Sequence, residues 1–123
     1  MEFDVRDYEI DLQGIVNNAN YQHYLEHARH DFLCSMNIDF AKLHDEGKDL
    51  IVSRIEIDYK HPLKSRDKFK VISSVHKEGN LRIVFDQLIL RLPDEKVVVN
   101  AKVIGVCVHN GKLVKPETVI DLG

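Results

Sequence analysis

The sequence contains one long segment with helical periodicity, and most of the chain after it alternates with the period of a β-strand. Residues 19–36 place apolar side chains three or four positions apart, which is typical of a helix that packs one face against a core. The apolar stripe consists of Tyr21, Leu25, Ala28, Phe32 and Met36. Such a helix needs a broad apolar surface to cover its stripe, and a sheet can supply one. These two patterns together predict an α+β domain.

Four strands are predicted after this helix. In residues 51–59, one face of the strand consists of Ile51, Ser53, Ile55, Ile57 and Tyr59, and the other of Val52, Arg54, Glu56 and Asp58. Pro62 ends that strand because proline cannot donate a hydrogen bond to a sheet. The segments EGN, LPDEK and NGK indicate the later turns, and a short tail follows the last of them. With a short strand before the helix, and a second helix over 39–46 closed by Gly47, we expect a five-stranded antiparallel sheet wrapped around one long central helix.

Two of the predicted strands depart from simple alternation. In residues 81–92 the apolar positions change parity at Asp86–Gln87, which predicts either a bulge there or burial of both faces. The last strand is apolar on both faces, with Val103, Ile104, Val106 and Val108. A one-layer sheet in water does not expose such a face, so we expect a partner subunit to cover it.

Composition narrows the class of protein. A chain of 123 residues corresponds to one domain, and its formal net charge of −3 argues against non-specific nucleic-acid binding. No apolar run approaches the roughly 20 residues of a membrane span, and the acidic, polar start is no signal peptide. The two cysteines, Cys34 and Cys107, match no metal motif. We therefore expect a cytoplasmic protein with reduced thiols.

The residues directly before the long helix allow two interpretations. Asn17, Asn18 and Asn20 are all good N-cap residues, so the segment could serve only to begin the helix. Alternatively, Asp11 is a base or nucleophile beside the exposed N–H groups of the helix start, which favour developing negative charge. Those N–H groups could hold the oxygen of a carbonyl under attack. This second arrangement is a compact hydrolytic device.

Four segments carry a resemblance to a known family. The stretch DLQGIVNNANY, followed by YLEHAR, resembles the signature of hotdog-fold acyl-CoA thioesterases of the 4-hydroxybenzoyl-CoA thioesterase type. The segments IDYKHPLKSRDKFKV, LRIVFDQLILR and VIGVCVHNGKLVKPETV resemble later parts of the same family, in the same order. The resemblance covers nearly the whole chain. It implies a single hotdog thioesterase domain over residues 1–123 that hydrolyses an acyl-CoA thioester to a free acid and coenzyme A.

The resemblance also implies a site and an assembly. The family's catalytic aspartate matches Asp11, as nucleophile or general base, and the N–H group that polarises the thioester carbonyl falls near Asn18. No metal or redox cofactor is expected. Subunits of the family pair sheet to sheet, which implies a homodimer or homotetramer. The pair Asn17–Asn18 is similar to variants linked to acyl-ACP thioesterases, so an acyl-ACP thioesterase is an alternative. A non-catalytic acyl-CoA-binding protein on the same fold is another.

Coenzyme A is anionic, so its phosphates need local cations. The candidates are Lys60, His61 and Lys64 near the Pro62 turn, and Lys77 and Arg82 around the EGN turn. Other titratable residues lie on the helix opposite its apolar stripe. His23, His27 and His30 are expected to face solvent or a subunit rather than a metal, and Glu26 is an alternative carboxylate base.

Overall fold

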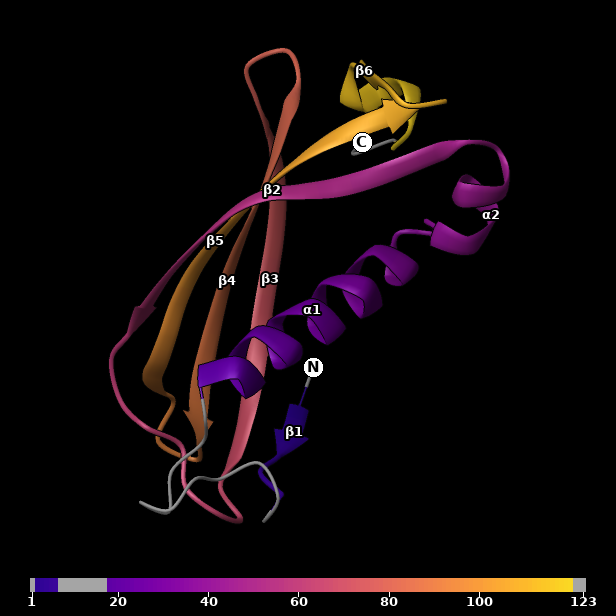
Figure 1. The fold of residues 1–123 in the computed structure, drawn as a ribbon. Coiled ribbons are helices and arrows are strands. Elements are labelled where there is room, and N and C mark those ends of the chain that lie inside the picture. The colour runs from indigo at the N-terminus through magenta and orange to yellow at the C-terminus, as the bar shows by residue number, and fades with distance from the viewer. Residues whose placement is uncertain (1, 7–17, 121–123) are drawn as a thin grey trace.

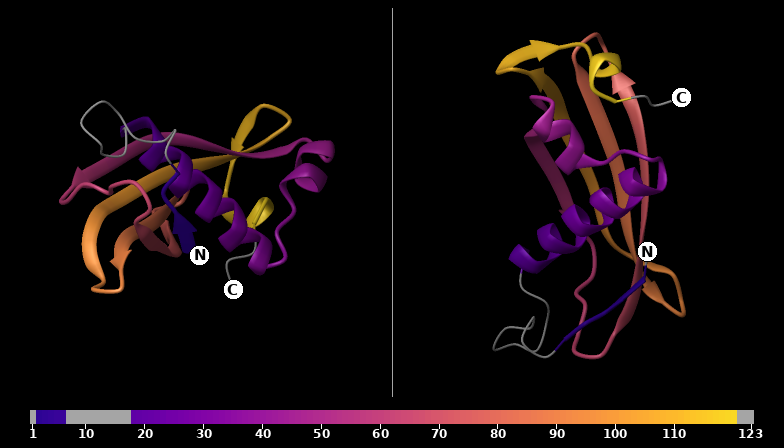
Figure 2. Two further views of the ribbon diagram at one scale, coloured as in Figure 1. Left: turned by 90° about the horizontal axis from the view of Figure 1, so that it is seen from below. Right: turned by 90° about the vertical axis from the view of Figure 1, so that its right-hand side faces the viewer.

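The computed structural model describes residues 2–6 and 18–120 of the chain. The strands are β1 (Glu2–Asp4), β2 (Lys48–Tyr59), β3 (Lys68–Glu78), β4 (Arg82–Leu92), β5 (Lys96–His109) and β6 (Lys112–Val114). The helices are α1 (Asn18–Ser35), α2 (Phe40–Asp45) and a 3₁₀ turn over Pro116–Thr118. The strands form one curled antiparallel sheet, and α1 runs across one face of it (Figures 1 and 2).

Five strands form the continuous path of the sheet, in the order β1-β3-β4-β5-β2. This is the predicted hotdog architecture, a long helix wrapped by an antiparallel sheet. β6 was not predicted as a strand. It pairs with the last residues of β5, so the tail after the NGK turn begins with a short strand.

The central helix begins and ends within one residue of its predicted bounds. Of the predicted stripe, Tyr21, Leu25 and Ala28 are buried, whereas Phe32 and Met36 are partly buried. Tyr24 and Leu33 widen the buried face on its two sides. The helix packs over two apolar clusters. One includes Phe69, Val71, Ile89 and Val99 of the sheet, and the other includes Phe85 and Val103.

The short second helix connects α1 to β2. The Asp39 side chain accepts a hydrogen bond from the Lys42 amide at 3.2 Å, which caps the first turn. Gly47 follows the helix with a φ of +78°, as the prediction of a glycine C-cap requires. Neither α1 nor α2 is long and apolar enough to cross a membrane.

A bulge in β2 changes the predicted faces of that strand. The pairing with β5 shifts between Val52 and Arg54, so Ser53 is the extra residue. Val52 pairs with Gly105 and Ile55 with Val103, which places both side chains on the face that α1 covers elsewhere. The prediction that one strict alternation runs through residues 51–59 was therefore wrong.

The change of parity in β4 has a different cause from a bulge. The pairing of β4 with β3 and β5 continues without a shift through Asp86 and Gln87, and Gln87 occupies a core position with 1% of its surface exposed. Leu88 then lies on the opposite face, partly buried. A glutamine occupies a core position here, and Val84 and Leu90 are buried on the opposite face, so of the two predicted alternatives the burial of both faces is confirmed.

The last long strand has the expected two apolar faces. Val103 is fully buried under the helix, whereas Ile104, Val106 and Val108 lie partly buried on the other face. Ion pairs lie on that outer face too, with Lys102 Nζ 3.8 Å from Glu78 Oε2 and His76 Nδ1 3.3 Å from Asp86 Oδ2. The outer face is thus a mixture of aliphatic and charged side chains rather than a bare apolar surface.

Candidate active site

The first turn of α1 is fixed to the connection between β2 and β3. The Tyr21 hydroxyl accepts a hydrogen bond from the Leu63 amide at 3.0 Å, and its ring lies 5.5 Å from the ring of Tyr59. Burial raises the pKa of Tyr21, so its hydroxyl stays protonated. The Lys60 amide in turn bonds to the Val98 carbonyl at 2.8 Å. These contacts hold the start of α1 against the β2–β3 connection, and the connection against β5.

The end of β1 is tied to the same connection. The Val5 amide donates to the Asp67 carbonyl at 2.9 Å, and the Arg66 amide donates to the Val5 carbonyl at 3.2 Å. Residues 7–17, which include the predicted catalytic Asp11, lie outside the described residues. Asn18, the predicted oxyanion position, is the first residue of α1. The described chain on both sides of residues 7–17 thus contacts one short segment of backbone.

The chemistry of this end of the molecule follows from the helix and from nearby cations. The first N–H groups of an α-helix have no partner within the helix, and the helix dipole adds positive potential there. Lys60, His61 and Lys64 are exposed on the connection that this helix start contacts. The arrangement can hold an oxyanion at the helix start and phosphate groups around it.

The other two predicted cations lie elsewhere. Lys77 and Arg82 flank the β3–β4 hairpin, at the opposite end of β3 from the Pro62 turn (Figure 1). β3 has 11 residues, so the two ends are about 33 Å apart. The Lys77 amine pairs with Glu117, and an Arg82 guanidinium nitrogen lies 4.0 Å from Glu78 Oε1. Lys60, His61 and Lys64 thus lie on the connection whose Leu63 amide contacts the first turn of the helix, whereas Lys77 and Arg82 lie at the far hairpin.

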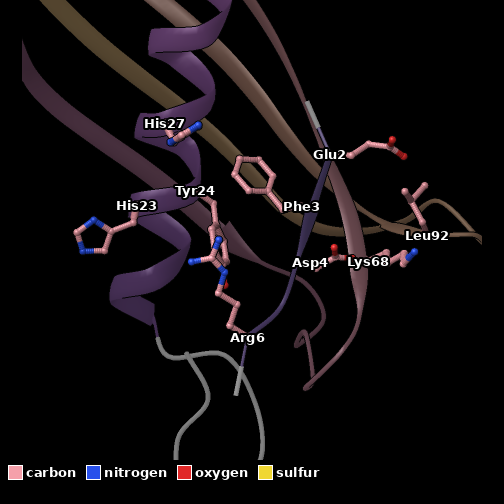
Figure 3. A pocket seen from close by; sticks show the side chains of 9 residues that line it. All are labelled: Glu2, Phe3, Asp4, Arg6, His23, Tyr24, His27, Lys68 and Leu92. Atoms are coloured by element: carbon pink, nitrogen blue, oxygen red, sulfur yellow. The ribbon is translucent and has the colours of Figure 1, made fainter. Parts of the chain in front are cut away.

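A cleft of about 710 Å³ lies beside α1, along β1 (Figure 3). Phe3 is in its wall, with its ring stacked on Phe69 at 5.0 Å and 5.5 Å from the ring of Tyr24. His23 and His27 line it from the helix. They are exposed, as expected, and no group of three potential metal ligands occurs among the described residues. The residues predicted to bind or hydrolyse the thioester do not line this cleft, as far as their positions are described.

A buried pair of polar side chains lies inside the core, and it was not predicted from the sequence. Arg29 and Gln87 are the polar side chains, among the described residues, that are more than nine-tenths buried. Arg29 Nη1 donates to Gln87 Oε1 at 3.1 Å, and Gln87 Nε2 donates to the Leu25 carbonyl at 3.1 Å and to Ser73 Oγ at 3.0 Å. Desolvation lowers the pKa of Arg29, and the charge of Glu26 opposes that shift.

A long helix on the concave face of a curled antiparallel sheet defines the hotdog class of folds. Residues 5–120 match the thioesterase-like superfamily, and the chain belongs to that superfamily. A crystal structure of a hypothetical protein from Aquifex aeolicus superposes with a TM-score of 0.87 at 31% identity, covering 97% of this chain and 94% of that one.

Two relatives of named activity are also similar to the chain. It is 39% identical over 110 residues to the chloroplastic acyl-acyl carrier protein thioesterase ATL3 of Arabidopsis thaliana, a match that covers 89% of this chain and 58% of the relative. The chain thus spans a little over half the length of that protein. It is 30% identical over 104 residues to the long-chain acyl-CoA thioesterase FadM of Escherichia coli K12, covering 85% of this chain and 78% of FadM.

Proposed function

We propose that the protein is an acyl-CoA thioesterase of the 4-hydroxybenzoyl-CoA thioesterase type, which hydrolyses an acyl-CoA thioester to a free acid and coenzyme A. One observation carries the proposal. The start of α1, whose N–H groups suit an oxyanion, is held by the Tyr21–Leu63 hydrogen bond against a connection that bears Lys60, His61 and Lys64. Membership of the thioesterase-like superfamily and the similarity to FadM support the same reaction.

In this proposal Asp11 carries the chemistry, by one of two routes. As a nucleophile, its carboxylate attacks the thioester carbonyl, the C–S bond breaks, and water then hydrolyses the acyl-aspartyl anhydride. As a general base, it takes a proton from water, whose oxygen attacks the carbonyl directly; the C–S bond then breaks, and the leaving thiolate of coenzyme A takes up the proton. In both routes the carbonyl oxygen becomes negative while it accepts hydrogen bonds from N–H groups near Asn18. Neither route needs a metal or a redox cofactor.

A hydrolysis assay with a panel of acyl-CoA esters tests the catalytic role of Asp11. Asp11→Asn removes the negative charge and keeps the shape of the side chain, so kcat should fall by at least about 100-fold while the thermal transition stays near that of the wild type. Equal hydrolysis by wild type and variant would exclude the catalytic role. A collapsed thermal transition in the variant would assign Asp11 to capping instead.

An acyl-ACP thioesterase is the second candidate, and one observation favours it. The Arabidopsis relative at 39% identity is an acyl-acyl carrier protein thioesterase, and the asparagine pair at 17–18 fits that assignment. The same acyl group should therefore be offered on coenzyme A, on acyl carrier protein and on N-acetylcysteamine. A kcat/KM that is highest for coenzyme A supports the first candidate, and one that is highest for the carrier protein supports the second. Binding of acyl-CoA by calorimetry without turnover would instead indicate a non-catalytic binding protein.

We further propose that the protein is a homo-oligomer, a dimer or a tetramer. β2 lies at one edge of the sheet and leaves one side of its backbone without a strand partner among the described residues. Its exposed side chains include Ile51, Val52, Ile55 and Tyr59. A long apolar edge of this kind is stabilised by pairing with a second copy, which places the two copies' sheets side by side.

A further inference from the structure

Gln87 connects three elements from a single buried position. It lies within β4 on the helix-facing side of the sheet, with 1% of its surface exposed. Its amide nitrogen donates to the Leu25 carbonyl on α1 and to Ser73 Oγ on β3, and its oxygen accepts from Arg29 on α1. The amide therefore uses both its donor and its acceptor atoms, and two of its three partners belong to the helix.

The contacts around this amide do not by themselves fix the helix. The buried stripe of α1 packs through Leu25 and Ala28 on aliphatic and aromatic side chains of the sheet. Such burial depends on area and not on direction, so it tolerates a small tilt or slide of the helix. Hydrogen bonds need a donor–acceptor distance near 3 Å and a narrow range of angles. The bonds of Gln87 to Leu25 and Arg29 are thus directional constraints at the middle of the helix, in addition to the Tyr21–Leu63 bond at its first turn.

We propose that Gln87 is a positioning residue that fixes the tilt and register of α1, and through the helix the place of its N-terminal N–H groups. The inference rests on the proposed hydrolysis at that helix start. Leu25 is seven residues after Asn18, which is about 10 Å along the axis. A tilt of about 6° at Leu25 would therefore displace the first turn by about 1 Å. Displacements of that size at an oxyanion site can lower turnover by as much as about 100-fold.

Two variants separate this role from simple stability. Gln87→Leu keeps an apolar side chain in the core, removes all three hydrogen bonds and leaves the Arg29 guanidinium without its acceptor. The double variant Arg29→Leu, Gln87→Leu removes both polar groups, which relieves the cost of a buried unpaired charge. We expect Gln87→Leu to lower the thermal midpoint and kcat, the latter by about tenfold or more with KM within about twofold. The double variant should regain most of the thermal midpoint but not kcat.

Ile89→Val is the matched control, because Ile89 is fully buried on the same strand and the same face. It should lower the thermal midpoint through a lost methylene and leave kcat unchanged. Recovery of both the midpoint and kcat in the double variant would overturn the proposal, since the polar pair would then matter only for stability. A wild-type kcat in folded Gln87→Leu would overturn it too.

If the wild-type protein hydrolyses no thioester, the proposed function fails but the positioning role of Gln87 does not. Amide hydrogen exchange then still tests that role. Exchange in the first two turns of α1 should be faster in Gln87→Leu and in the double variant than in the wild type, and unchanged in Ile89→Val. Unchanged exchange in both Gln87 variants would show that the bonds of Gln87 do not hold the helix start.

Discussion

The side chains of Lys60 and Lys64 lie on the connection that holds the helix start. Their exposed amines should attract the coenzyme A phosphates in the ground state and in the transition state alike. Replacing both by alanine is therefore expected to raise KM for acyl-CoA by about fivefold to tenfold and to change kcat little. This is the expected result when binding of the ground state and of the transition state is weakened equally. Steady-state kinetics at low salt measures this, and the effect should shrink in high salt because these charges are solvent-exposed.

Arg82→Ala is the control for this experiment. Arg82 is exposed and near Glu78 at the far end of β3. Its removal should leave KM for acyl-CoA within about twofold of the wild-type value, because only removal of a group that binds the substrate changes KM in this way. A larger effect of Arg82→Ala than of the double lysine variant would place the phosphates at the β3–β4 hairpin, as the sequence alone allowed.

The two cysteines should differ sharply in reactivity. Cys34 is exposed on α1, whereas Cys107 is fully buried in β5. Burial raises the pKa of Cys107 to about 11, with a smaller contribution from the charge of Glu117. Because the thiolate is the reactive form, Cys107 should be inert at pH 8. A thiol reagent with mass readout should add one label to the native protein and two after denaturation. Two labels on the native protein would contradict the buried position.

Single residues were predicted with uneven success, and burial explains the difference. The sequence indicated that His23 and His27 are exposed, because they lie opposite a clear apolar stripe, and the structure confirms this. It did not indicate that Arg29 and Gln87 meet, because a contact between residues 58 positions apart leaves no local pattern. The change of parity at Gln87 was the available signal. Of its two interpretations, the bulge is wrong and the burial of both faces is confirmed, but the buried amide was not predicted.

At the scale of elements, helix ends and turns were predicted well and strand faces less well. The helix over Phe40–Asp45 was bounded correctly to within one residue because Asp39 and Gly47 are cap residues that act locally. Ser53 is an extra residue of β2 opposite the consecutive residues Ile104 and Gly105 of β5, so the bulge is recognised only when the pairing of the two strands is known. One extra residue then reverses the face of every side chain before it.

The junction between α2 and β2 offers a test of local geometry. Gly47 has a φ of +78°, its carbonyl accepts from the Asn110 amide at 2.8 Å, and an added Cβ would lie 2.1 Å from Asn110 Oδ1. Gly47→Ala must therefore strain the backbone and displace Asn110. We expect a loss of about 2–3 kcal/mol in the free energy of unfolding, measured in denaturant.

Gly79→Ala provides the comparison for that substitution. Gly79 also has a positive φ, of +65°, but nothing lies within 4 Å of the position of its added Cβ. This variant should lose only the backbone term, about 1–2 kcal/mol. Equal losses in the two variants would mean that the contact of Gly47 with Asn110 contributes nothing, so that only the left-handed backbone conformation matters at the junction.

At the scale of the whole molecule, the two edges of the sheet differ in their suitability for assembly. β1 pairs with β3 only over residues 68–70, so part of that edge is covered. β2 forms the other edge along its 12 residues and exposes Val52, Ile55 and Tyr59 on the helix-facing side of the sheet. The sequence predicted a partner from the outer face of the last strand. The structure adds β2 as a second apolar surface, which includes the edge itself.

Substitution in β2 should therefore change the mass of the particle. Ile55 is 39% exposed, and Ile55→Lys would place a charge at the centre of the proposed contact, where it would be buried without a partner. Light scattering at micromolar concentration should give an oligomer for the wild type and about half that mass for the variant. Leu81→Lys is the matched control, because Leu81 is 41% exposed but lies at the β3–β4 hairpin. The particle mass of this variant should equal that of the wild type.

A monomeric wild type would contradict the assembly altogether. An oligomer that persists in Ile55→Lys, with its fold intact, would move the contact to the outer face around Ile104 and Val106, where a lysine at Val106 would be the next substitution to measure.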